Sequence, residues 1–76
     1  MADEISTLMM KNKNRKILLR LRNTHTVTGI LKEFDLHMNL TLEDTEETAD
    51  GKTKKIGKIL LRGDNVLLIS LPKEES

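Results

Sequence analysis

The hydrophobic period of this chain changes at Arg15, and this change constrains the fold more than any other feature of the sequence. Before Arg15, the residues Ile5, Leu8 and Met9 recur at helical spacing, which predicts a short amphipathic helix over residues 3–11. After Arg15, apolar and polar residues alternate with a period of two, and clusters of turn residues interrupt the alternation. The pattern predicts five short strands over residues 15–22, 26–35, 39–42, 53–62 and 65–71, the third ending in an acidic run.

The turn residues and one glycine indicate how these strands are arranged. Gly29 lies near the middle of the second strand, where a glycine usually marks a sharp bend or a close backbone approach. Asp50-Gly51 predicts a hairpin between the third and fourth strands, because both residues tolerate a positive φ. We therefore expect an all-β fold, in which a short N-terminal helix precedes a strongly bent, five-stranded antiparallel sheet that forms a small open barrel.

The chain is too short to be very stable on its own. A 76-residue domain buries only about 60% of the surface that its unfolded chain exposes. Cysteine is absent, so disulfides cannot reinforce it. The segments Ile59–Leu61 and Val66–Ile69 are apolar on both faces, and such edges invite another chain to pair with them. We expect the fourth strand of one copy to pair with the fifth of the next and close a ring; the alternative is a monomer whose helix covers the extra face.

The sequence offers little for catalysis, cofactors or membranes. It has no glycine-rich phosphate loop, no serine–histidine–aspartate cluster with recognisable spacing and no paired histidines at helical spacing. We expect no enzyme activity, no cofactor and no metal. The longest apolar run is Val66–Ile69, far short of a membrane span, and Asp3 and Glu4 stand where a signal peptide would be basic. These features predict a cytoplasmic protein.

Charge is segregated along the chain although the net charge is only +1. A basic stretch over residues 11–22 is followed by an acidic stretch over residues 43–50 and a second basic stretch over residues 52–62. Such blocks suit an anionic partner, and they also suit copies of the chain packing against each other. Solvated strand faces are the simpler explanation.

Two polar loops, residues 35–39 and 62–65, lie at strand ends, where binding residues often occur. Recognition of a single-stranded nucleic acid needs a flat group on which a base stacks and a donor–acceptor pair for its edge. The chain has one aromatic residue, a phenylalanine, so the planes of His37 and Arg62 would have to serve. The amide of Asn39 carries the donor and acceptor. Taken singly, each of these residues is more often an ordinary loop or turn residue than a binding residue.

The two loops lie within two longer sets of residues that resemble the Sm motifs in order and spacing. The first set is Gly29-x-Leu31, Asp35, Met38-Asn39, Leu42 and Glu46-Glu47, and the second is Leu61-Arg62-Gly63-Asp64-Asn65-Val66. The resemblance covers residues 15–71, with motif 1 over about residues 15–47 and motif 2 over about residues 59–71. It is closest to the archaeal Sm-like (LSm) proteins and not to bacterial Hfq. It implies one Sm-like domain over residues 1–76, ending in a tail from residue 72.

The resemblance also implies a function. It implies a ring of seven copies, with six as the alternative, that binds uridine-rich single-stranded RNA at a central pore, one base per subunit. His37 and Arg62 would sandwich the base, Asn39 would bind the uracil edge, and Asp64 would orient Asn39. Asp35 and Gly63 would shape the two loops. Such a ring would act as a scaffold or chaperone in RNA processing or turnover; the alternative is a structural or protein-interaction ring that does not bind RNA.

Overall fold

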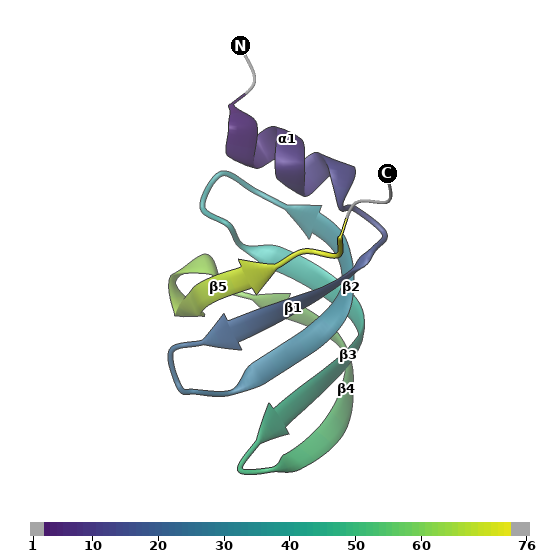
Figure 1. The fold of residues 1–76 in the computed structure, drawn as a ribbon, viewed down its shortest axis with the longest axis vertical. Coiled ribbons are helices and arrows are strands. Elements are labelled where there is room, and N and C mark those ends of the chain that lie inside the picture. Colours follow the sequence, from purple (N-terminus) through teal and green to yellow (C-terminus); the bar gives the residue numbers. More distant parts are fainter. Residues whose placement is uncertain (1–2, 74–76) are drawn as a thin grey trace.

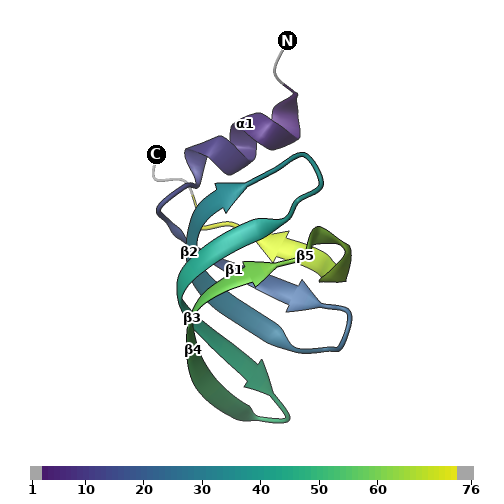
Figure 2. The same cartoon turned by 180° about the vertical axis from the view of Figure 1, so that it is seen from behind.

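One helix and five antiparallel strands make up the computed structural model, which describes residues 3–73 (Figure 1). The elements are α1 (Glu4–Lys11), β1 (Lys16–Leu21), β2 (Thr26–Phe34), β3 (Leu40–Ala49), β4 (Lys52–Leu61), the 3-10 turn η1 (Gly63–Asn65) and β5 (Val66–Ser70). The strands form one sheet in the order β4-β3-β2-β1-β5. Figure 2 shows the strong curl of this sheet from the other side. The expected fold, a helix followed by an open five-stranded barrel, is confirmed.

Helix α1 begins at a side-chain cap. Asp3 accepts hydrogen bonds from the backbone N–H of Ser6 at 2.7 Å and from its hydroxyl at 3.1 Å. These bonds favour the ionised carboxylate, so they hold the pKa of Asp3 below its ordinary value. Met9 is the buried residue of the helix and joins the core below it. The helix lies across one end of the barrel, and the β3–β4 hairpin lies at the opposite end (Figures 1 and 2).

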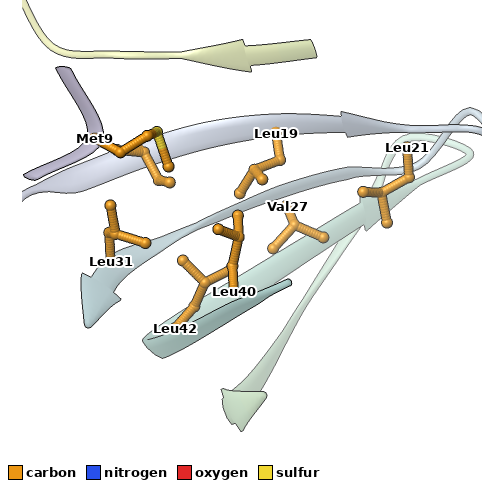
Figure 3. Packing of buried hydrophobic residues seen from close by; sticks show 8 residues of the cluster. Met9, Leu19, Leu21, Val27, Leu31, Leu40 and Leu42 are labelled. Atoms are coloured by element: carbon orange, nitrogen blue, oxygen red, sulfur yellow. The ribbon is translucent and has the colours of Figure 1, made fainter. Parts of the chain in front are cut away.

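The core is formed by alternate residues of the first three strands. In β1, Ile17, Leu19 and Leu21 point inward while Lys16 and Arg20 are exposed, as the period of two predicts. Figure 3 shows Leu19 of β1 pointing toward Val27 of β2 and Leu40 of β3 in the interior of the curled sheet. The buried apolar residues are Met9, Ile17, Leu19, Leu21, Val27, Leu31, Leu40 and Leu42. Each such side chain contributes about 1.5–3 kcal/mol when it leaves water.

The bend expected at Gly29 is present. The pairing of β2 with β3 shifts register between Thr28 and Ile30, at this glycine. A Cβ atom at Gly29 would lie 2.5 Å from Cγ2 of Thr45 and 3.2 Å from the carbonyl oxygen of Glu43. The absence of a side chain therefore allows β3 to cross close to β2 and the sheet to curl around the core.

The third strand is longer than predicted. We expected it to end at the acidic run, but β3 continues to Ala49 and pairs with β4 from Leu40 to Ala49, with an irregularity between Leu42 and Glu46. In this stretch Glu46 lies opposite Lys55 and Glu47 lies opposite Lys54, and opposite charges across a strand pair are favourable. The hairpin then reverses at Asp50 and Gly51, whose φ values of 52° and 75° confirm the expected turn.

The sheet remains open because β4 and β5 form its two edges. Both edge strands are apolar toward the core and toward solvent: Ile59 and Ile69 pack against the core cluster, while Leu60, Leu67 and Leu68 are exposed. Among residues 3–73 no helix is long and apolar enough to cross a membrane. The exposed leucines leave apolar surface uncovered at both edges of a single copy.

Replacing Gly29 with alanine is expected to destabilise the fold. The new methyl group would overlap Cγ2 of Thr45, and overpacking of this kind costs about 1–3 kcal/mol. The free energy of unfolding, measured by denaturant titration at one protein concentration, gives the cost. Thr45→Ser removes Cγ2, so Gly29→Ala should cost less in that background; an equal cost in both backgrounds would show that the overlap is unimportant.

Candidate functional site

The loop between β2 and β3 is organised by the carboxylate of Asp35. Its Oδ1 accepts the backbone N–H groups of His37 at 2.9 Å and Asn39 at 3.0 Å, and its Oδ2 accepts the side-chain amide of Asn39 at 3.0 Å. Backbone bonds between Asp35 and Asn39 and between Met38 and Asp35 close the neck of the loop. The hydrogen bonds from Asn39, followed by those from His37, hold the pKa of Asp35 below its ordinary value. The loop is therefore a compact turn built around an ionised carboxylate.

The side chain of Asn39 joins this loop to the turn between β4 and β5. Its Nδ2 donates to Asp35, and its Oδ1 accepts the backbone N–H of Gly63 at 2.8 Å. We expected Asp64 to orient Asn39; the hydrogen bonds that the Asn39 amide makes go to Asp35 and Gly63. An ionised carboxylate can only accept and a backbone N–H can only donate, so these two partners also fix which end of the amide carries the oxygen.

Gly63 allows the two loops to approach each other. A Cβ atom at this position would overlap the carbonyl oxygen of His37 and lie 2.8 Å from the carbonyl carbon of Met38. Met38 itself adopts a φ of 59° and packs partly against the core. No side chain larger than a hydrogen atom fits between the loops at position 63 unless the backbone moves.

The two loops together line an open hollow of about 580 Å³ at the surface. The side chains of His37 and Arg62 are exposed beside it, and Asn39 is half-buried. The residues lining it are His37, Met38, Asn39, Arg62, Gly63 and Asp64. The structure thus brings together the three residues that the sequence suggested for base recognition, although they come from loops more than twenty residues apart. Asp35 lies behind the hollow and supports it.

The hollow presents the kinds of group that recognition of a base requires: an amide with unused hydrogen-bonding capacity and two flat side chains. The nitrogen and the oxygen of the Asn39 amide each make one hydrogen bond within the protein. One N–H and one lone pair of the oxygen are therefore left for a ligand. Imidazole and guanidinium planes are both surfaces on which bases stack. Among residues 3–73 no group of histidine and carboxylate side chains is placed to hold a metal ion.

One contact near the site could not be found from the sequence. The guanidinium Nε of Arg22 donates to the carbonyl oxygen of Asp64 at 2.5 Å, across 42 positions of the chain. The acceptor is a backbone atom, so no residue type marks it. The role of Asp35 could have been found more directly, because an aspartate that accepts the N–H two residues later is a common turn element.

Acid is expected to loosen the β2–β3 loop. Because the pKa of Asp35 is lowered in the folded protein, its stabilising bonds are fully present above the ordinary value of 3.8 and are lost as the pH falls through the lowered value. The backbone amide signals of His37 and Asn39, followed by NMR, should therefore shift with a midpoint below 3.8. In Asp35→Asn the transition should be absent. A midpoint at or above the ordinary value would contradict the hydrogen bonds described.

Comparison with known proteins gives one consistent result. The LSM domain family model matches residues 7–71. A protein of Pyrococcus horikoshii described as snRNP Sm-like is 40% identical over 76 residues, which are 99% of this chain and 100% of that protein. Small nuclear ribonucleoprotein G of Schizosaccharomyces pombe is 36% identical over 62 residues, 80% of each chain.

Solved structures agree with the sequence relatives. The P. aerophilum SmAP1 heptamer has a chain that superposes with a TM-score of 0.89 at 38% identity, covering 97% of this chain and all of that one. The Sm protein of Pyrococcus abyssii, solved in complex with a uridine heptamer, superposes with a TM-score of 0.84 at 34% identity, covering 92% of this chain and all of that one. On the matched domain, the shared fold and these identities, the chain belongs to the LSM-domain, or Sm-like, family.

Proposed function

We propose that this chain assembles into a ring and binds uridine-rich single-stranded RNA, one base at each copy of the hollow, without catalysing a reaction. The observation that carries the proposal is the amide of Asn39, which is held in one orientation and still offers one donor and one acceptor. The structure of the Pyrococcus abyssii Sm protein with a uridine heptamer supports it. The base would stack on the planes of His37 and Arg62.

The fixed amide explains why uracil would be preferred over cytosine. Uracil presents a carbonyl acceptor beside its N3–H donor, whereas cytosine presents an amino donor beside an N3 acceptor. The order of donor and acceptor is therefore reversed between the two bases. A freely rotating amide would flip to suit either base, but Asp35 and Gly63 prevent the flip of Asn39. To meet the fixed amide with its amino group and N3, cytosine would have to turn over or shift sideways within the hollow, and either change moves its ribose away from the path of the RNA strand.

Assembly into a ring would join several weak sites into one strong site. Stacking is worth about 1–3 kcal/mol per base, so one copy would hold one base only weakly. Sites linked by the RNA backbone bind the following bases at high effective concentration. Pairing of β4 with β5 of a neighbouring copy would provide the ring and cover Leu60, Leu67 and Leu68. The P. aerophilum heptamer supports seven copies, with six as the alternative.

A ring of this kind would serve as a scaffold or chaperone in RNA processing or turnover. Nothing in the hollow supplies a nucleophile paired with a base, so we propose that the RNA is bound and not cut. RNA that copurifies with the protein, once sequenced, should be rich in uridine tracts. Its binding should weaken as salt rises, because phosphates release counterions on binding.

Truncation of Asn39 is expected to abolish the preference for uracil. We expect the wild type to bind oligo(U) more tightly than oligo(C). Asn39→Ala should lower the ratio of the oligo(C) dissociation constant to the oligo(U) dissociation constant at least about tenfold, which is the lower part of the range for a base contact made of two hydrogen bonds. Fluorescence anisotropy measures both constants. Asn65→Ala, on the neighbouring turn, is the matched control and should keep the ratio. Equal affinity of the wild type for both oligonucleotides would refute base recognition by this site.

Charge placed on the sheet edges is expected to break the ring. Leu60→Glu on β4 and Leu67→Glu on β5 would each bring a carboxylate into the proposed apolar contact, which should lower the number of copies counted by native mass spectrometry. Leu36→Glu is the control, because Leu36 is 89% exposed but lies in the β2–β3 loop, away from both edges. A wild type that consists of folded single copies in dilute solution would contradict the ring.

A further inference from the structure

Arg22 lies directly after β1 and holds the turn that carries Arg62. Its backbone N–H donates to the carbonyl oxygen of Asn65 at 2.9 Å. Its Nε donates to the carbonyl oxygen of Asp64 at 2.5 Å. One residue therefore binds two consecutive carbonyl groups of η1. No residue of the resembling motifs suggested this contact, and the expected base-binding residues do not include Arg22.

The turn has few other constraints. No residue of η1 is buried, and no side chain caps the turn. Within the turn, the N–H of Asn65 donates to the carbonyl of Arg62 at 3.1 Å, which closes it but does not fix its position on the barrel. The residues that flank the turn, Leu61 and Val66, pack against the core and pair with neighbouring strands, so they place its two ends. Two contacts from outside the turn then hold the segment between them: Arg22 on one side and the bond from Gly63 to Asn39 on the other.

A continuous set of hydrogen bonds thus runs from β1 to the proposed base site. Arg22 holds the carbonyl groups of η1, the N–H of Gly63 in the same turn donates to Oδ1 of Asn39, and Nδ2 of Asn39 donates to Asp35. If η1 moves away from β1, the Gly63 bond lengthens and the amide loses the partner that fixes its oxygen. Uracil and cytosine would then be accepted more equally.

We propose that Arg22 is a positioning residue that sets the uracil preference of the site by holding η1 against β1. The effect on RNA rests on the proposed function, whereas the contact between Arg22 and η1 rests on the structure alone. The role requires a guanidinium, because its Nε–H points in a fixed direction from a planar group, whereas the ammonium of lysine is a rotating point charge. Within residues 3–73 the other N–H groups of the Arg22 guanidinium make no hydrogen bond, so a plain charge contact to phosphate is the competing role.

The test compares Arg22→Lys, which keeps the charge, with Arg20→Lys. Arg20 is an exposed arginine of the same strand end whose side chain makes no hydrogen bond within the described residues, so it is the matched control. The first measurement needs no RNA: hydrogen exchange of the Gly63 amide in the free protein. We expect Arg22→Lys to speed this exchange about fivefold, the ratio that one net hydrogen bond is worth, and Arg20→Lys to leave it unchanged.

The second measurement is the ratio of dissociation constants for oligo(C) and oligo(U), at several salt concentrations. We expect Arg22→Lys to lower this ratio about fivefold without changing the salt dependence. The proposal is overturned if Arg22→Lys behaves as the wild type in either measurement. It is also overturned if Arg22→Ala weakens both oligonucleotides equally and lowers the salt slope by about 0.7, the value for one phosphate contact on a single strand.

The two proposals fail in different ways. A wild type without any preference for oligo(U) would overturn the proposed function, while the exchange of the Gly63 amide would still support or overturn the hold by Arg22. A slower or unchanged exchange in Arg22→Lys would overturn the hold even where the wild type prefers oligo(U). Should Arg22→Ala fail to fold, Arg22→Lys carries both measurements by itself.

Discussion

The bond from the N–H of Gly63 to Oδ1 of Asn39 is the contact on which the site depends. It joins two loops that are far apart in the chain, and it can form because position 63 carries no side chain that would overlap the opposite backbone. With the bond from Asn39 to Asp35 it fixes the orientation of an amide that would otherwise rotate. An amide in a fixed orientation distinguishes bases, whereas a rotating amide accepts either order of donor and acceptor.

The barrel brings the two loops together by its curvature. Gly29 lets β3 cross close to β2, and the sheet then curls until the loop after β2 and the turn after β4 lie at the same place on the surface. The small core drawn from α1, β1, β2 and β3 holds this curl. The same curl leaves β4 and β5 as open edges with exposed leucines. In the proposed ring, one geometric feature would therefore produce both the binding hollow and the surfaces through which copies associate.

Much of this architecture could be predicted from residue patterns. The period of two located the strands, Gly29 indicated the bend, and Asp50-Gly51 indicated the hairpin. The end of β3 was predicted wrongly, because acidic residues are poor strand formers on their own, whereas here Glu46 and Glu47 lie opposite lysines of β4. His37, Asn39 and Arg62 were chosen for their chemistry and do line one hollow. The sequence did not indicate that the Asn39 amide bonds to Asp35 and Gly63.

The sequence by itself determined the class of fold, the strand order along the chain and the kinds of chemical group available in the loops, because these follow from local spacing and residue type. Only the tertiary structure decided which atoms hold the Asn39 amide and what anchors η1. Those partners are the backbone N–H of Gly63 and the carbonyl groups of Asp64 and Asn65. Every residue type carries such backbone groups, so their use as partners depends on how the sheet curls and leaves no mark in the sequence.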